Sequence, residues 1–511
     1  MATGLAFLCL TARLIALSQL GVARGGFELL PALHMSALTD HFWEFILFAH
    51  TKPPLTDVIY SILFRVCDSC NNNNLSLIPV MLFDTAAAVL VYLACLRIGT
   101  DRVLSFLITA VWSVGLVSFE VWKFGLHQDH YTVFLASLFA WALVNRTTIP
   151  RLRNDLILAA AASILVLQST VALVAVPLTL LATLWISSGS ITRLPNYKPF
   201  LVVALLPVLI GGGLVVKNYI NVGVPSSSSV GGQNMMQFVL VKEVGTWNHD
   251  GLYERAQHLG LPEWWLWCFQ RSREIYPNPR VQAPLYGRCI TSPTRYDFVP
   301  LQVHLASGAE TDLSKLIAQD QQDSERRPWL FAGAVSESTT RFAAKYGSQS
   351  FLVWMDYLTH QPLDFLISSI EVHHRFYMAG HTMLSGYPNM PELLRVIFKW
   401  VLRLAALGTY LLAAGLVSYP LYSKKRNVSS SLIAVGLIAF ASVVTASLFN
   451  ISTCCENDRM YLQVTPYLVI VASYGVFRLW SVGSNVVGVR LRIVELGASN
   501  SSQIENENCS Y

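Results

Sequence analysis

Residues 50–66 have the sequence HTKPPLTDVIYSILFRV, and whether this stretch crosses a bilayer decides the topology of the whole chain. Pro53 and Pro54 each lack a backbone donor and fix φ, so the stretch begins as a poor membrane helix. The part that follows, 54–66, is shorter than the about 20 residues that a crossing needs. We therefore predict a juxtamembrane or re-entrant helix, since irregular backbone at membrane depth survives where protein or a wet cavity satisfies it.

The composition is that of an integral membrane protein. The 511 residues are 53% hydrophobic and 13% charged, with a mean hydropathy of +0.46, whereas soluble proteins carry about 25% charged residues. The net charge of +5 is spread over short basic segments, which indicates orientation in a bilayer and no nucleic-acid partner. The 9 cysteines are too few for a disulfide scaffold. Cys67 and Cys70 form C-x-x-C without a second pair, so we expect a local disulfide or two free thiols.

The apolar runs predict an all-α polytopic fold with about ten membrane helices. Arg13 interrupts the first run and no clear cleavage site follows, so we expect a membrane helix there rather than a signal peptide. The run 153–188 is too long for one crossing, and LQST near its middle predicts a hairpin turn. The expected spans are 5–22, 75–97, 103–119, 130–147, 153–168, 170–188, 198–216, 397–421, 430–449 and 461–480.

Short basic loops fix the expected orientation. They fall on one face if the spans are counted in this way, and the positive-inside rule makes that face cytoplasmic. If 54–66 were a further crossing, the segments before and after it, 23–53 and 67–74, would fall on opposite sides of the membrane. The basic residues are Arg97, Arg102, Arg146, Arg151, Arg153, Arg193, Lys198, Lys424, Lys425, Arg426 and Arg478.

The spans divide the chain into four regions. We expect an N-terminal transmembrane region, 1–217, with its first luminal loop at 23–74. Residues 218–396, rich in Gly, Pro, Ser and charge, predict a mixed α/β or irregular extracytoplasmic domain. C-terminal membrane helices, 397–481, and a disordered cytoplasmic tail, 482–511, follow. Within the domain, PEWWLWCFQ suits either a helix at the membrane interface or plain core packing.

The polar residues that a transfer reaction needs gather in the loops of the non-cytoplasmic face. Three segments carry them, and they are distant in sequence: the first loop, the segment near 120–131, and CCENDRMYLQVTPYL. The residues of interest are Glu28, Asp40, His50, Lys52, Glu120, Asp129, His130 and Arg459. Topology alone does not show that they converge.

These segments resemble the GT-C superfamily of membrane glycosyltransferases, which includes protein O-mannosyltransferases and aminoarabinose transferases. FELLPALHMSALTDHFWEFILFAHTKPPL is similar to their first luminal loop with its KPPL or QPPL element. SFEVWKFGLHQDHYTVFLAS is similar to their acidic second loop, and ENDRMYLQVTPYLVIVA to their late loop. KNYINVGVPSSSSVGGQN resembles a segment that follows the seventh span in uncharacterised bacterial members. Members related to the mannosyltransferases carry Asp-Glu after the first helix, whereas this chain has Glu28, with Asp40 further along.

The resemblance implies inverting transfer of a mannose-like hexose from a polyprenyl or dolichyl phosphate to a protein or glycan acceptor. Glu28 or Asp40 would accept the proton of the attacking hydroxyl, and Arg459 with Lys52 would hold the lipid phosphate. His50, Glu120, Asp129 and His130 would bind substrate. The resemblance implies no particular cofactor. It is compatible with a divalent cation but does not identify the metal.

Each role has a bland structural alternative. Glu28 and Asp40 fit solvated or helix-capping positions, Lys52 a snorkelling side chain, and Arg459 an interfacial anchor. Glu120 and Asp129 fit helix termini. The spacing of His127 and His130 suits a metal on a helix, but such a pair is more often structural.

Two other function classes compete with the transferase. A transporter or lipid scramblase would show repeated halves and mid-membrane charges, yet no repeat is visible and Asp84 is the main charged residue within the spans from 75 onward. The second competing class is a non-catalytic subunit with the same fold. The endoplasmic reticulum membrane is the expected location, and a bacterial inner membrane is the alternative. Sequons stand at Asn74 and Asn450 on the luminal side and at Asn145, Asn427, Asn500 and Asn508 on the cytoplasmic side.

Overall fold

The computed structural model describes residues 1–20, 38–50, 53–66, 77–114, 128–188, 197–228, 241–243, 246–247, 249–275, 311–330, 340–365, 430–449 and 463–486, with a few positions between 367 and 415. These residues are mostly helical, as the composition predicts.

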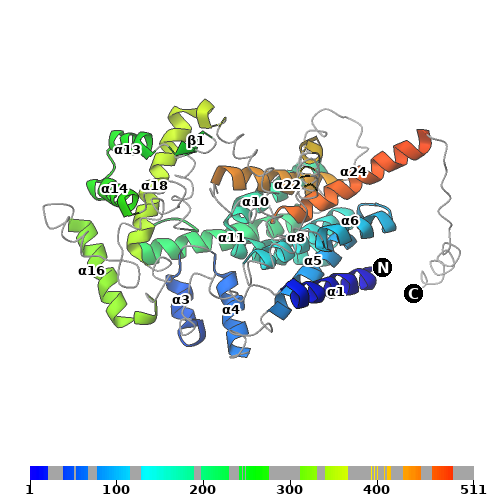
Figure 1. The fold of residues 1–511 in the computed structure, drawn as a ribbon, viewed down its shortest axis with the longest axis horizontal. Helices are drawn as coiled ribbons and strands as arrows, with labels where there is room; N and C mark the ends of the chain where they lie inside the picture. The colour runs from blue at the N-terminus through cyan, green and yellow to red at the C-terminus, as the bar shows by residue number, and fades with distance from the viewer. Residues whose placement is uncertain are drawn as a thin grey trace.

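The apolar helices pack into a bundle on the right of Figure 1, where most of them run lengthwise. They follow the expected spans closely, with three exceptions. The span 397–421 lies largely outside the described residues, the helix expected at 198–216 continues to Val222, and the one expected at 461–480 runs from Thr465 to Val486. The bundle consists of α1 (Ala2–Leu20), α5 (Leu77–Arg97), α6 (Arg102–Val114), α8 (Gln128–Thr148), α9 (Leu152–Gln168), α10 (Thr170–Ser188), α11 (Tyr197–Val222), α22 (Ser430–Phe449) and α24 (Thr465–Val486).

Among the residues that the structure describes, two helical segments are long and apolar enough to cross a membrane, Pro79–Arg97 and Val203–Val222. Further helices of the described region have shorter apolar segments, among them Ala2–Ile15 and Ser431–Thr445. The count of ten crossings therefore stays a prediction.

The loop between α5 and α6 is a tight turn built by three consecutive residues. Gly99 has φ +88, a conformation that costs glycine little, and Thr100 N–H bonds back to the Cys95 carbonyl at 3.3 Å. Asp101 then caps α6, because its Oδ1 accepts from the N–H groups of Val103 and Leu104, each at 2.9 Å. The turn reverses the chain as the hairpin between these two expected spans requires.

A buried ion pair joins α1 to α5. Arg13 Nε lies 3.5 Å from Asp84 Oδ2, with side-chain exposures of 3% and 8%. Arg13 also donates to the Ser113 hydroxyl at 3.1 Å and to the Ser113 carbonyl at 3.0 Å, on α6. The arginine that interrupts the first apolar run therefore neutralises the aspartate of α5 and ties three helices together.

The helix ends that carry Arg97 and Arg146 meet at one end of the bundle. Arg146, near the end of α8, pairs with Asp155 at the start of α9. Arg97, at the end of α5, donates to Asn145 Oδ1 at 3.1 Å. Thr147 bonds Ser431 at the start of α22 at 2.7 Å. These contacts gather the ends that the charge pattern assigns to one face, and they bury the Asn145 sequon.

The described residues of the 218–396 region are mainly helical and lie at the left of Figure 1, whereas we expected a mixed α/β or irregular domain. Its strands are confined to one short antiparallel pair in the described part. Its elements are β1 (Val241–Glu243), β2 (Thr246–Trp247), α13 (His249–His258), α14 (Glu263–Ile275), α16 (Thr311–Arg326), η5 (Pro328–Leu330) and α18 (Arg341–His360).

The tryptophan-rich segment on α14 is core. Trp264, Trp265 and Phe269 are at most 1% exposed. Trp265 stacks on Tyr346 of α18 with ring centroids 5.4 Å apart, and its Nε1 donates to the Ser350 hydroxyl at 3.3 Å. The interfacial alternative is therefore wrong for these three side chains, because α18 covers them.

Candidate functional site

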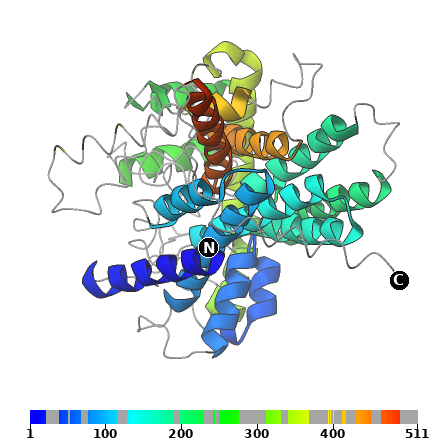
Figure 2. The same cartoon turned by 90° about the vertical axis from the view of Figure 1, so that its right-hand side faces the viewer.

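Two short helices of the first loop, α3 (Phe42–Phe48) and α4 (Leu55–Val66), lie together at the lower edge of the molecule in both views (Figures 1 and 2). Both point crosswise to α11 and the neighbouring bundle helices (Figure 1). Helix α4 has 12 residues and falls within the stretch 54–66 for which a short helix was expected. Its juxtamembrane or re-entrant placement stays a prediction.

The polarity of α4 is inverted compared with a helix on a water-soluble protein. Its buried face carries Thr56, Asp57, Tyr60 and Ser61, each at most 3% exposed. Its outer face includes Ile62 and Val66, which are 57% and 81% exposed. A soluble amphipathic helix turns its apolar face inward, whereas polar side chains at membrane depth face the protein interior.

Hydrogen bonds fix this helix against the rest of the first loop. Ser61 donates to the Leu38 carbonyl at 2.8 Å, and Arg65 donates to the Thr39 carbonyl at 2.8 Å. Asp40, a predicted base, follows directly in the turn before α3 and is exposed. The described parts of the first loop, 38–50 and 53–66, are thus held together by side-chain hydrogen bonds.

The start of α4 is joined to the bundle through Gln168. This residue ends α9, and the turn predicted from LQST lies at Ser169. Gln168 Nε2 donates to the Thr56 hydroxyl at 2.9 Å and to the Thr132 hydroxyl at 3.2 Å. Because Thr132 lies in the first part of α8, one buried amide connects the first loop, the second loop's helix and the α9–α10 turn.

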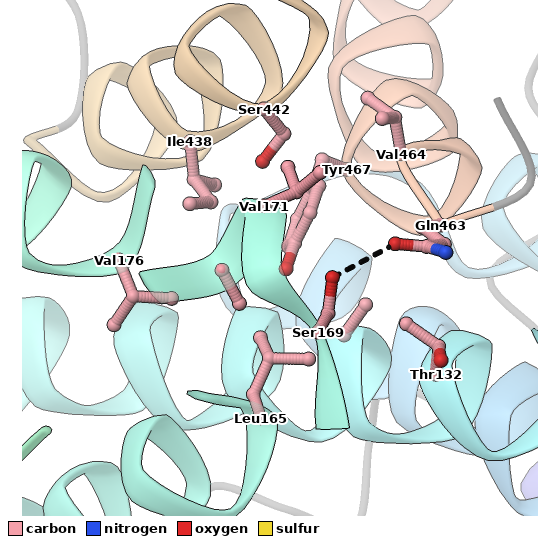
Figure 3. A pocket seen from close by; sticks show the side chains of 12 residues that line it. Thr132, Leu165, Ser169, Val171, Val176, Ile438, Ser442, Gln463, Val464 and Tyr467 are labelled. Carbon is pink, nitrogen blue, oxygen red and sulfur yellow. Dashed lines mark hydrogen bonds between the residues drawn. The ribbon is translucent and has the colours of Figure 1, made fainter. Parts of the chain in front are cut away.

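The same turn contacts the beginning of α24. Ser169 donates to Gln463 Oε1 at 3.1 Å, as the dashed line in Figure 3 marks. Beside this bond lies a small cavity of about 20 Å³, room for one water. Its polar lining comes from Thr132, Ser169, Ser442, Gln463 and Tyr467, and the remainder is apolar (Figure 3).

The predicted site residues are only partly covered by the structure. His50 is buried, at 1% exposure, after the end of α3. The backbones of Asp129 and His130 form the first turn of α8. The catalytic candidate Glu28 and the binding candidates Lys52, Glu120 and Arg459 lie outside the described residues, as does the C-x-x-C pair.

The 218–396 unit docks on the first loop beside Asp40. The His41 ring stacks on Trp329 of η5, with centroids 4.1 Å apart. Arg327 lies 3.5 Å from Glu44 Oε2 on α3, and its guanidinium sits 4.8 Å above the Phe48 ring. One flank of the loop is therefore formed by a segment far away in sequence.

An acidic pair on α16 orders the start of α18 behind this contact. Asp320 accepts from the backbone N–H groups of Arg341 and Phe342 at 3.1 and 3.0 Å, and Asp323 accepts from the Arg341 guanidinium at 2.6 Å. Burial raises the pKa of Asp320 to about 6, although the hydrogen bonds and Arg341 act in the opposite direction. Asp323 also bonds Arg327, at 3.3 Å, which continues the network to the first loop.

Among the side chains that the structure describes, no three His, Cys, Asp or Glu gather to hold a metal ion. The side chains of Asp129, His127 and His130, which were considered for a metal ion, lie outside that set.

The structure adds residues that the sequence did not single out for function: Thr56, Gln168, Ser169 and Gln463. The available signal was a glutamine between two apolar helices, at a turn that the sequence predicts. Burying an amide side chain there costs free energy unless it is hydrogen-bonded. Hydrogen-bond partners from other loops were therefore to be expected.

No protein-family model matches the chain, and no curated protein matches it either.

Proposed function

We propose that this protein is a membrane glycosyltransferase that moves a mannose-like hexose from a polyprenyl or dolichyl phosphate to a protein or glycan acceptor, with inversion. Glu28 or Asp40 accepts the proton of the attacking hydroxyl. Lys52 and Arg459 hold the lipid phosphate. His50, Glu120, Asp129 and His130 contact the sugar or the acceptor.

One observation carries the proposal: the two hydrogen-bonding centres of a single turn, Gln168 and Ser169. Gln168 bonds Thr56, shortly after Lys52, and Thr132, shortly after His130. Ser169 bonds Gln463, shortly after Arg459. Residues close in sequence to three segments of the proposed chemistry are thus joined at one end of the bundle. Arg146 and Asp155 lie at the opposite ends of helices α8 and α9.

The chemistry suits such a place. The leaving group is a phosphate at the level of the lipid headgroups, and its charge grows as the glycosidic bond breaks. A guanidinium and an ammonium that are already in position stabilise that charge without reorganisation. A carboxylate in the first loop, close to the acceptor's entry from the aqueous side, removes the proton as the new bond forms.

The proposed face is the lumen of the endoplasmic reticulum, with the bacterial periplasm as the alternative. Cys268 of α14 is disulfide-bonded, while Cys9 and Cys95 of the bundle are free. Disulfides persist in oxidising compartments, which supports an extracytoplasmic 218–396 unit.

The test is transfer from a labelled dolichyl-phosphate hexose by the purified protein, with the variants Glu28→Ala and Asp40→Ala. Glu254→Ala, on an exposed position of α13, is the matched control. One of the two loop variants should lose at least about 100-fold in rate, the contribution of a general base, while the control keeps the wild-type rate. Full transfer by both variants contradicts the base assignment, and no transfer by the wild type contradicts the function.

A transporter is the second candidate, and the buried pair of Arg13 and Asp84 favours it. Ionisable residues within membrane helices often mark substrate or proton pathways. The pair is also tied to Ser113, which equally suits a structural anchor.

A further inference from the structure

The end of α11 carries a polar stripe that the proposed chemistry does not use. Lys217, Asn218 and Asn221 occur in KNYIN, within the last turns of the apolar segment Val203–Val222. Lys217 and Asn221 are one helical turn apart and so share a face. A lysine and an asparagine on the same face of a membrane helix need partners there.

Their partners are the carbonyl groups at the end of α3. Lys217 Nζ donates to the Ile46 carbonyl at 3.2 Å and also to the Ala49 carbonyl. Asn221 Nδ2 donates to the Leu47 carbonyl at 2.9 Å. Helix α11 thus supplies donors to three backbone acceptors of the first loop.

The sequence of α3 explains why it needs these donors. It has only 7 residues, FWEFILF, and no glycine or polar side chain at its C-terminal end. The last carbonyls of a helix have no partner within the helix. A cation there also interacts favourably with the negative end of the helix dipole.

These contacts of Lys217 and Asn221 with the end of α3, which we call the clamp, directly precede the segment HTKPPL. His50 follows Ala49 directly, and the far end of the segment is held where Thr56 bonds Gln168. Bundle helices α11 and α9 therefore hold both ends of the segment, and the Asp57 carboxylate on α4 adds an electrostatic interaction with Lys217.

We propose that Lys217 and Asn221 are positioning residues, which hold the C-terminal end of α3 and thereby fix the position of His50, a proposed contact of the sugar or the acceptor. This inference rests on the proposed function. Neither residue touches the reacting atoms: they act through the backbone of residues 46–49.

The kinetic test compares Lys217→Met, Lys217→Arg and Asn221→Ala in the dolichyl-phosphate hexose assay. Lys217→Met fills similar space without a donor, and a displaced segment should lower kcat by about 10- to 100-fold. Lys217→Arg keeps a charged donor and should recover most of that loss, and Asn221→Ala should fall between the two. Lys345→Met removes the same charge from an exposed position of α18 and should match the wild type.

The second readout needs no activity. Hydrogen–deuterium exchange should be faster over residues 42–50 in Lys217→Met than in the wild type, unchanged over residues 131–143 of α8, and near the wild-type rate in Lys217→Arg. Unchanged exchange over residues 42–50 in Lys217→Met would overturn the proposed role of Lys217. An equal loss of kcat in Lys217→Met and Lys217→Arg would overturn it as well. A wild type that shows no transfer, with the exchange pattern as expected, overturns the proposed function and leaves the clamp standing.

Discussion

The imidazole of His41 stacks on the indole of Trp329, with ring centroids 4.1 Å apart and planes 5° apart. His41 belongs to the first loop and Trp329 to the 218–396 unit. Trp329 also packs against the cluster of Leu38, Phe45 and Tyr60. A segment that follows the seventh expected span therefore packs against the first loop next to Asp40.

This contact predicts that Trp329→Ala destabilises the protein. Loss of the stack and of the buried ring area should lower the free energy of unfolding by about 1–3 kcal/mol. Thermal unfolding in detergent measures the change. Trp43→Ala is the matched control, because Trp43 is 79% exposed. Equal shifts in the two variants would show that the stack does not hold the docking contact.

The ion pair of α1 and α5 predicts an asymmetric mutational response. Asp84→Ala leaves Arg13 charged and buried, which should cost about 3–5 kcal/mol. The double variant Arg13→Met with Asp84→Leu should recover most of that stability in the same thermal assay. If it also keeps sugar transfer, the pair is an anchor. A double variant as unstable as Asp84→Ala contradicts this account.

The Asp320 carboxyl predicts a signed pH dependence. Burial disfavours the charged form and raises the pKa of Asp320 in the folded state from its ordinary value of 3.8 to about 6. The folded state therefore keeps the proton to higher pH than the unfolded chain, and this group's contribution to stability falls as pH rises from about 4 to about 6. The stability advantage of the wild type over Asp320→Asn should thus be larger at pH 4 than at pH 7. The opposite slope would mean that the bonds to Arg341 and Phe342 outweigh burial.

The glutamine at the α9–α10 turn predicts a loss of both stability and activity. Gln168→Leu leaves the buried hydroxyls of Thr56 and Thr132 without its amide, at a cost of about 1–3 kcal/mol. Sugar transfer should fall as the loops separate. Gln257→Leu, exposed on α13, is the control. Normal transfer by Gln168→Leu would argue that the loops meet without this junction.

Local rules were enough to predict much of the fold. Run length and hydropathy predicted helices close to the observed bounds, and polar LQST predicted the turn at Ser169. The short apolar run after two prolines predicted the short helix α4. These features depend on neighbours in sequence, so they are visible without a structure.

Pairings between distant segments were not predictable. Arg13 and Asp84 each stood out in the sequence, but nothing local matches one to the other. Trp264 suits an interface and a core equally, because both bury aromatic rings, and only the position of α18 decides. The helices that the structure describes between 249 and 360 were not predicted one by one, because they are less apolar than the expected spans and carry charged residues throughout.

The sidedness of Lys52 and Arg459 is the most direct test of the central claim. Single cysteines at 52, 459 and 151, in variants without the native cysteines, would be labelled with a membrane-impermeant maleimide in sealed vesicles of known orientation. We predict that 52 and 459 react from the luminal side and that 151 reacts only after the vesicles are opened. Labelling of 52 and 459 from opposite sides would contradict a shared site for the lipid phosphate.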